Sequence, residues 1–175
     1  KWNTNAAILS GDAMQILAYE YLAKTPAVHL GRVLQIFSKT ALEVCEGQQY
    51  DMDFETTELV SVKEYLRMIE LKTSVLLAGS LLIGAVIGGA DEQASHSLYE
   101  FGKNVGLAFQ LQDDYLDVYG DPAISRKPIG NDIVANKKTY VLITALELAD
   151  GKILDELNHY LSLKNFNSED KIKAV

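Results

Sequence analysis

Helical periodicity extends along nearly the whole of this chain and limits the folds open to it more than any other feature. Apolar residues recur three and four positions apart, no segment alternates convincingly like a half-buried strand, and only three prolines interrupt 175 residues. A chain of this length can form one cored domain. The sequence therefore predicts a single all-α domain over residues 1–175, built as a bundle of antiparallel helices.

Both ends of the chain interrupt this pattern. Lys1 is not Met and leads almost at once into helical periodicity, while a new apolar period begins at 171–175 and stops there. We therefore expect an incomplete domain that lacks N-terminal helices and the C-terminal end.

Capping and breaking residues predict the helix boundaries. Ser61 and Glu64 form a capping box that opens the third helix, and Asp91 caps the fourth. Pro26 ends the first helix, and Gly47 ends the second before an acidic, solvated loop at 48–58. Helices are expected at about 4–22, 28–46, from 61 through 89, from 91 through the aspartates at 113–117, 139–149 and 153–161, with Ser168 and Asp170 capping a last one. The first helix is expected to bury Ala7, Leu9, Met14, Leu17, Ala18 and Tyr21.

The charge balance and the single cysteine exclude several classes of function. A formal net charge of -8 argues against nucleic acid as a partner, because a phosphate backbone selects clustered Lys and Arg. Cys45 has no partner for an internal disulfide and is expected to be a buried small hydrophobe in a reducing, cytoplasmic setting. The apolar run at 75–90 lies between Lys72 and Asp91 and is shorter than the ~20 residues of a membrane span. We expect a core helix and no integral membrane segment.

Three carboxylates on an otherwise apolar helix are the clearest sign of chemistry. In the stretch FQLQDDYLD, the spacing of Asp113, Asp114 and Asp117 allows all three to share one helix face. Like charges this close repel unless a cation lies between them, and carboxylate oxygens suit Mg²⁺. The sequence therefore predicts a magnesium site here, with a solvated acidic helix face as the alternative.

Cationic residues form the second and third signals. Those that follow the aspartates are Arg126, Lys127, Lys137 and Lys138, with Asp132 among them. Beside a candidate metal site on an acidic chain they favour a diphosphate ligand, although loop lysines are often only solvated. Lys72 and Thr73 lie within an apolar helix, where Lys72 either extends to the surface or points into a pocket. Thr73 either offers its oxygen to a positive centre or bonds back to its own helix.

Taken in order, these motifs resemble those of the trans-isoprenyl diphosphate synthases of the farnesyl and geranylgeranyl type, the polyprenyl synthetase family. The resemblance is carried by Gly11-Asp12, Gly47-Gln48, Lys72-Thr73, FQLQDDYLD at 109–117, Gly120-Asp121, Lys127, Gly130, Asp132 and Lys137 to Thr139. It covers essentially the whole chain, which corresponds to the middle and later part of such an enzyme without its first aspartate-rich motif. One departure is Arg126, which stands where the family usually has Gly before the loop lysine.

The resemblance implies an isoprenoid-synthase helical fold and a prenyltransferase, usually a cytoplasmic homodimer. Such an enzyme makes linear isoprenyl diphosphates by 1'-4 head-to-tail condensation of isopentenyl diphosphate with an allylic diphosphate, using up to three Mg²⁺ ions between two aspartate motifs. The implied metal ligands are Asp113, Asp114, Asp117 and Asp132. The implied diphosphate contacts are Lys72, Lys127 and Lys137, with oxygen dipoles at Thr73 and Gln110 facing the developing cation and Phe109 at the isopentenyl pocket.

Two other interpretations fit fewer of these residues. A class I terpene cyclase also uses aspartates and Mg²⁺ on an all-α fold, but it has no need for Lys127 and Lys137, and residues 167–169 lack its spaced ligands. A non-catalytic partner subunit or helical interaction protein would have no use for the aspartates together with Lys72 and Lys127. Because the first aspartate motif is not among these 175 residues, we expect them to be inactive alone.

Overall fold

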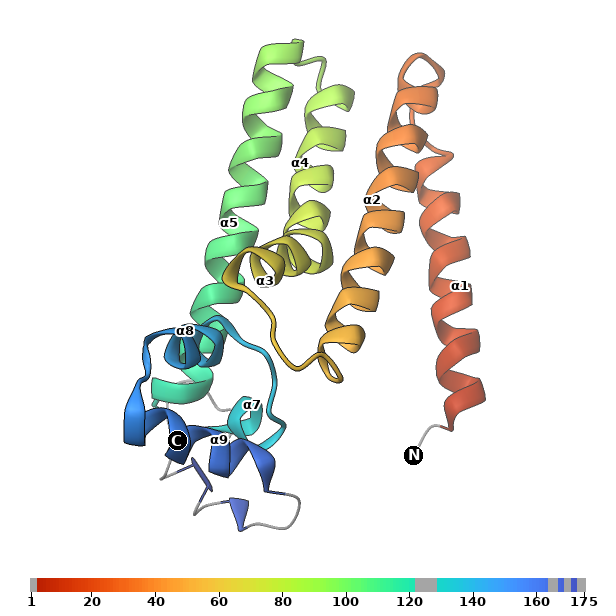
Figure 1. The fold of residues 1–175 in the computed structure, drawn as a ribbon. Coiled ribbons are helices and arrows are strands. Elements are labelled where there is room, and N and C mark those ends of the chain that lie inside the picture. Colours follow the sequence, from red (N-terminus) through yellow and green to blue (C-terminus); the bar gives the residue numbers. More distant parts are fainter. Residues whose placement is uncertain (1–2, 122–128, 164–166, 169–170, 173–175) are drawn as a thin grey trace.

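Helices make up the fold throughout the part of the chain that the structure describes. The computed structural model describes residues 3–121, 129–163, 167–168 and 171–172. Its helices are α1 (Thr4–Leu22), α2 (Ala27–Phe54), α3 (Val62–Ile69), the π-helical η1 (Glu70–Ser74), α4 (Val75–Ile87), α5 (Glu92–Tyr119), α7 (Asn131–Val134), α8 (Tyr140–Leu148) and α9 (Gly151–Ser162). The long helices α2, α4 and α5 run alongside one another with α1 outside α2, and α7, α8 and α9 gather at one end of the bundle (Figure 1). The predicted all-α class is confirmed.

Side-chain caps explain where several helices begin. Ser61 Oγ accepts from the Glu64 N–H at 3.3 Å, and the Glu64 carboxylate accepts from the Ser61 N–H at 2.9 Å, which confirms the predicted capping box. Asp91 caps α5 as predicted, and Thr139 caps α8 in the same way. The expected cap at Asp170 lies outside the described residues.

The second helix is longer than the sequence predicts. α2 continues through Gly47 to Phe54, so the predicted stop at Gly47 and the loop beginning at 48 are wrong. A Cβ on Gly47 would lie 2.2 Å from the Lys72 backbone nitrogen, so the glycine serves close helix packing and not helix termination. The extension places Asp51 in the last turn of an ordered helix beside η1.

The helical stretch Val62–Ile87, formed by α3, η1 and α4, lies at the centre of the bundle. By length and composition alone it could cross a membrane, and 44% of its apolar window is buried within this molecule. It packs between α2 and α5, which is the position of a core helix. The principal core cluster near its start contains Phe54, Val60, Tyr65, Met68, Ile69 and Ile143.

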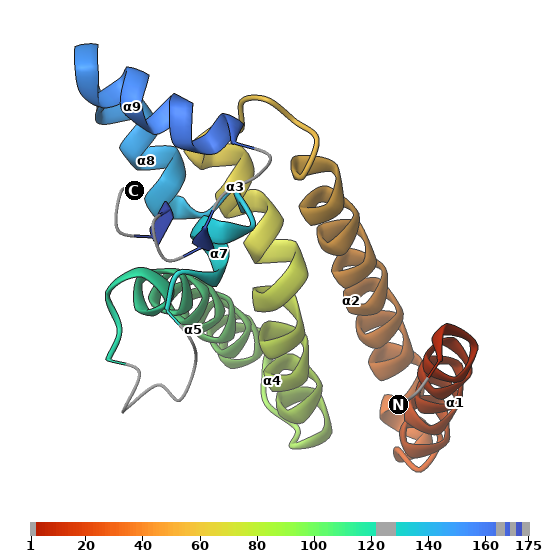
Figure 2. The same cartoon turned by 90° about the horizontal axis from the view of Figure 1, so that it is seen from below.

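α1 buries none of its residues, contrary to the sequence prediction. Leu9 is 66% exposed and Tyr21 is 70% exposed, although the periodicity predicts that both face the core. The helix lies at the edge of the bundle (Figure 2), where the Tyr19 ring meets the Phe37 ring at 5.2 Å between centroids. The predicted burial of Cys45 is also wrong, since its side chain is exposed. Periodicity identifies an apolar face but not the surface that covers it.

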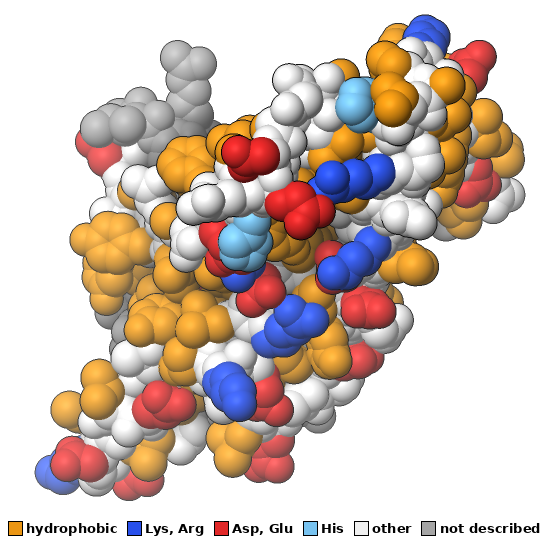
Figure 3. Space-filling view, turned by 90° about the horizontal axis from the view of Figure 1, so that it is seen from above, with side chains coloured by type: hydrophobic (Ala, Val, Ile, Leu, Met, Phe, Trp, Pro, Cys, Tyr) orange, Lys and Arg blue, Asp and Glu red, His pale blue; other side chains and the backbone are white. Residues whose placement is uncertain are grey.

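Charges of both signs are mixed on the face of the molecule seen from above (Figure 3). Among the described residues on this face, Lys and Arg side chains lie beside Asp and Glu side chains and do not form one continuous basic patch. This distribution agrees with the net charge of -8.

Candidate active site

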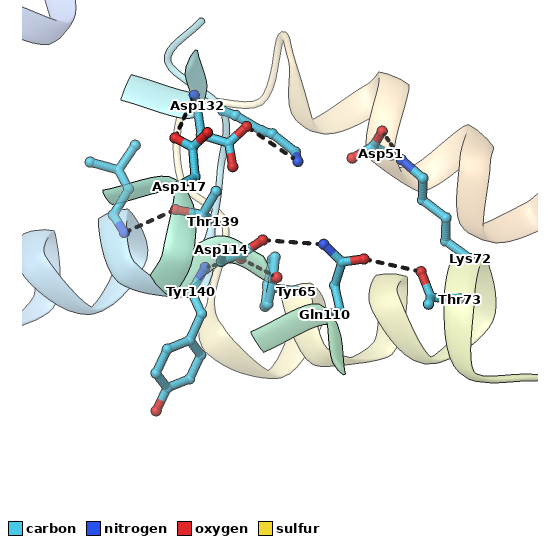
Figure 4. Close-up of polar contacts among 12 residues, drawn as sticks. Asp51, Tyr65, Lys72, Thr73, Gln110, Asp114, Asp117, Asp132, Thr139 and Tyr140 are labelled. Atoms are coloured by element: carbon cyan, nitrogen blue, oxygen red, sulfur yellow. Dashed lines mark hydrogen bonds and ion pairs between the residues drawn. The ribbon is translucent and has the colours of Figure 1, made fainter. Parts of the chain in front are cut away.

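A chain of hydrogen bonds links η1 to Asp114 of α5 (Figure 4). Thr73 Oγ1 donates to Gln110 Oε1 at 3.2 Å, and Gln110 Nε2 donates to Asp114 Oδ1 at 3.2 Å. Asp114 Oδ2 also accepts from the Tyr65 hydroxyl and, at 3.2 Å, from the Tyr140 N–H. The fold thus joins Thr73, Gln110 and Asp114, three of the residues predicted from the sequence, in one network.

Asp114 is the buried centre of this network. Asp114 is only 1% exposed, and the groups that donate hydrogen bonds to its carboxylate come from α3, α5 and α8. Burial, and then the hydrogen bond to Asp114, raise the pKa of the Tyr65 hydroxyl, which therefore stays protonated and donates at neutral pH. Because both carboxylate oxygens already accept from protein groups, this placement favours a positioning role for Asp114 over the metal-ligand role predicted from the sequence.

The π-helical turn η1 carries Lys72 and Thr73. Glycines on the two neighbouring helices allow their backbones to approach it closely: Gly47 on α2 faces the Lys72 nitrogen, and a Cβ on Gly106 of α5 would lie 2.5 Å from Ser74 Cα. Single π-helical turns within α-helices are frequent at functional sites. The sequence predicts an uninterrupted α-helix here, because the hydrophobic pattern does not reveal the wider turn.

Lys72 forms an ion pair that the sequence analysis missed. Its Nζ lies 2.6 Å from Asp51 Oδ2, and the two side chains are 32% and 20% exposed, respectively. The sequence places Asp51 in a solvated loop, whereas the structure places it in α2. The only sign of such a partner in the sequence is that apolar residues flank Lys72. They imply that Lys72 is partly buried, and a partly buried ammonium requires a compensating anion.

A second polar cluster lies at the C-terminal end of α5. Asp117 Oδ2 accepts from the Asp132 N–H at 3.0 Å, and Lys137 Nζ lies 3.5 Å from Asp132 Oδ1. Gly130, with φ of 79°, reverses the chain before α7 and donates its N–H to the Asp117 carbonyl at 2.7 Å. The turn therefore brings together two predicted metal ligands and one predicted diphosphate lysine.

Two cavities border this cluster. One, of about 430 Å³, lies between the end of α2 and the segment after α7; its lining residues are Asp51, Phe54, Glu55, Ala135, Asn136, Lys137 and Lys138. The other, of about 200 Å³, has Asp132, Lys137 and Thr139 at one side and mostly apolar residues of α8 and α9 at the other. Lys137 thus lines both cavities.

Negative charge at the end of α5 is incompletely balanced. Burial raises the pKa of Asp132 above its ordinary value, Lys137 lowers it, and the carboxylates of Asp117 and Asp114 raise it further. The net direction is upward, so the folded chain holds ionised Asp132 at a cost. A bound cation would remove this cost.

Replacing Asp132 with Asn should therefore change how stability depends on pH. A raised folded-state pKa means that the favourable contribution of Asp132 is complete below its unfolded pKa and is lost as pH rises through the folded pKa. We expect the free energy of unfolding of Asp132→Asn, relative to the unsubstituted chain, to increase between about pH 4 and about pH 7 without Mg²⁺. Urea denaturation at both pH values measures this difference; a constant or decreasing difference would contradict the interpretation.

Mg²⁺ fits this site only as an ion shared with a ligand. Among the described residues, no three Asp, Glu, His or Cys side chains are grouped closely enough to hold a metal ion by themselves. Mg²⁺ is usually bound by one or two carboxylates together with waters and substrate phosphates, and the Asp117 and Asp132 carboxylates, which lie close enough that Asp117 raises the pKa of Asp132, suit that arrangement. Asp113 is half-buried one residue before Asp114 on the same helix.

Two other predicted residues are placed less completely. Phe109 lies on α5 and is 58% exposed, so its position at an isopentenyl pocket stays a prediction. Lys127, together with the unusual Arg126 before it, falls outside the described residues.

Comparison with known proteins gives consistent matches over nearly all of the chain. The family model described as polyprenyl synthetase matches residues 1–175. A geranylgeranyl diphosphate synthase from Methanosarcina mazei is 42% identical over 149 residues, which are 84% of this chain and 46% of that protein. A short chain isoprenyl diphosphate synthase from Methanocaldococcus jannaschii is 41% identical over 172 residues, 97% of this chain and 52% of that protein. This chain therefore spans about half the length of the curated relatives it matches.

Solved structures give the same result for the fold. A crystal structure of a geranylgeranyl pyrophosphate synthase has a TM-score of 0.91 and 46% sequence identity, and the match covers 99% of this chain and 53% of that one. The geranylgeranyl pyrophosphate synthetase from Pyrococcus horikoshii Ot3 has a TM-score of 0.89 and 35% identity, covering 98% and 52%. The expected isoprenoid-synthase type of helical fold is confirmed.

Proposed function

Because this chain belongs to the polyprenyl synthetase family, we propose that it acts in a prenyltransferase that makes linear isoprenyl diphosphates. The reaction is the 1'-4 head-to-tail condensation of isopentenyl diphosphate with an allylic diphosphate. The observation that carries the proposal is the hydrogen-bonded chain from Thr73 through Gln110 to Asp114, with Lys72 beside Thr73 on η1 (Figure 4). Relatives named geranylgeranyl and farnesyl diphosphate synthases support the same reaction class.

Lys72, Lys127 and Lys137 would bind the allylic diphosphate. Lys137 lines the cavity of about 430 Å³, and Asp51, the partner of Lys72, lines the same cavity from α2. A diphosphate entering between these groups would exchange carboxylate partners for phosphate oxygens at both lysines. Lysine ammonium groups bind phosphate oxygens well because they are compact positive charges.

In the proposed reaction a carbocation would form beside the hydrogen-bonded residues Thr73, Gln110 and Asp114. The C1–O bond of the allylic diphosphate breaks, and the diphosphate leaves with the electron pair. The double bond of isopentenyl diphosphate then attacks C1 to form the new C–C bond, and a proton passes from the resulting cation to the departed diphosphate. Thr73 donates its own hydrogen to Gln110, so its oxygen lone pairs can face the cation as a preorganised dipole. Phe109 would border the isopentenyl pocket.

Asp113, Asp117 and Asp132 would hold Mg²⁺ together with diphosphate oxygens. The ion would neutralise the leaving diphosphate when bound. Lys137, which already pairs with Asp132, would orient a phosphate oxygen beside the same carboxylate. Asp114 would act by orienting Gln110. It accepts a hydrogen bond from Gln110 Nε2, which keeps Gln110 Oε1 directed toward Thr73.

Binding of inorganic diphosphate with Mg²⁺ tests this assignment on the chain itself. We expect the affinity measured by titration calorimetry to fall by about tenfold or more in Lys72→Met and in Lys137→Met, because each removes a charged hydrogen-bond donor. Lys152→Met is the control, since Lys152 is exposed on α9 and lines neither cavity. Equal affinities in all four proteins would argue against a diphosphate site.

Turnover by these 175 residues alone is not expected. The leaving group needs neutralisation from two aspartate clusters in the family's reaction, and this chain contributes the α5 cluster. Incubation with isopentenyl diphosphate, farnesyl diphosphate and Mg²⁺, followed by separation of products by chain length, should give substrate only. Longer prenyl diphosphates formed by the purified chain would contradict this expectation.

We further propose that the enzyme is a cytoplasmic homodimer. The exposed apolar face of α1, which includes Leu9, Met14 and Leu17, is the feature that supports association. The single cysteine, Cys45, is free and exposed, which fits a reducing compartment such as the cytoplasm.

A further inference from the structure

The short helix α7 carries residues of the candidate site but is too short to be stable by itself. It has only four residues, Asn131–Val134, yet it carries Asp132 and ends three residues before Lys137. Backbone at both of its ends is left-handed: Gly130 before it has φ of 79° and Asn136 after it has φ of 52°. A single helical turn is not stable by itself in water, so contacts from elsewhere must hold it.

Residues 171 and 172, far along the chain, contact both ends of α7. Ile172 covers Gly130 so closely that a Cβ on the glycine would lie 2.6 Å from Ile172 Cγ1. At the other end, Lys171 Nζ donates to Asn136 Oδ1, and Asn136 Nδ2 donates to the Leu161 carbonyl at 2.8 Å. Lys171 is 1% exposed, so its ammonium lies within the protein.

Burying a lysine is costly unless hydrogen bonds or charged partners offset the desolvation of its ammonium group. Desolvation of an ammonium costs several kcal/mol by itself, and burial lowers the pKa of Lys171. The contact made with Asn136 holds a non-glycine residue in the left-handed conformation immediately before Lys137. The Lys137 N–H in turn donates to the Asp132 carbonyl at 2.9 Å, and the Asp132 N–H donates to Asp117. Each link connects Lys171 to the proposed diphosphate and metal cluster.

We propose that Lys171 and Ile172 form a clamp across the two ends of α7, and that Lys171 is a positioning residue that sets Lys137 and Asp132 for diphosphate binding. The role of the clamp in diphosphate binding rests on the proposed function. Its role in holding α7 in place does not. Lys171 does not line either cavity, so it acts through Asn136 and not by touching the ligand.

Amide exchange in the unliganded chain tests the mechanical part. Lys171→Met keeps a long buried stem and removes the ammonium, and Asn136→Gly keeps the left-handed backbone while removing both side-chain hydrogen bonds. We expect faster exchange of the Asp132 and Lys137 amides in both variants, with unchanged exchange in α4. Lys152→Met, an exposed lysine on α9, is the control. Unchanged exchange at Asp132 and Lys137 in the folded variants would overturn the clamp.

Titration with Mg²⁺ and inorganic diphosphate tests its purpose. We expect Lys171→Met to weaken binding by about tenfold, as loss of a supporting contact commonly does at metal sites. In a Lys137→Met background the same substitution should have a much smaller effect, because its influence passes through Lys137. An equal loss in both backgrounds would assign Lys171 a merely structural role. If the unsubstituted chain does not bind diphosphate, the proposed function fails while the exchange experiment still decides the clamp.

Discussion

Gly47→Ala is expected to lower the free energy of unfolding by about 3 kcal/mol and to displace Lys72. The added methyl carbon would lie 2.2 Å from the Lys72 nitrogen and 2.7 Å from the Leu71 carbonyl carbon, which are backbone atoms that cannot rotate away. α2 and η1 must therefore separate. Asp51, one turn further along α2, would move relative to Lys72 at the same time. Urea denaturation measures the stability change, and titration with Mg²⁺ and diphosphate measures the loss of affinity.

Gly31→Ala is the matched control for this change. Gly31 lies in the same helix, and a Cβ there would meet no atom within 4 Å. We expect the free energy of unfolding to rise by up to about 1 kcal/mol, because Ala favours helix more than Gly does, with diphosphate affinity unchanged. Wild-type stability and affinity in Gly47→Ala would show that the close approach of α2 to η1 does not position Lys72.

Features that depend on near neighbours in the chain were predictable from the sequence. The Ser61–Glu64 capping box and the Asp91 cap each involve residues within one helical turn, and both occur in the structure. Gly47 was not predictable in the same way. A helix stop and a close helix contact both need a residue without Cβ, and only the position of Lys72, 25 residues later, decides between them.

The candidate site shows the same limit on a smaller scale. The spacing of the α5 aspartates predicts a shared face, but it does not say which carboxylate turns toward the core. The packing of α3 and α8 decides this, because Tyr65 and the Tyr140 N–H both reach Asp114. Asp51 was missed for a related reason: its partner lies 21 residues away, across a boundary that the sequence placed too early.

Asp114→Ala should be the most destabilising substitution among the α5 aspartates. It removes the acceptor for the Tyr65 hydroxyl, the Tyr140 N–H and Gln110 Nε2 in a nearly solvent-free position. Leaving buried donors without an acceptor costs the desolvation of each, so we expect the free energy of unfolding to fall by about 3 kcal/mol or more. The measurement is urea denaturation at neutral pH, where the Tyr65 hydroxyl is protonated because its pKa is raised.

Asp113→Ala distinguishes a positioning carboxylate from a metal ligand on the same helix. Asp113 is only half-buried, so its removal should change the free energy of unfolding by less than about 1 kcal/mol. It should nevertheless weaken the Mg²⁺-dependent binding of diphosphate, because Asp113 is a proposed ligand and Asp114 is not. The two substitutions should therefore have opposite profiles, stability for one and metal-linked affinity for the other. If Asp114→Ala folded stably and lost only Mg²⁺-dependent binding, Asp114 would be a metal ligand as the sequence predicts, and its hydrogen bonds would be secondary to that role.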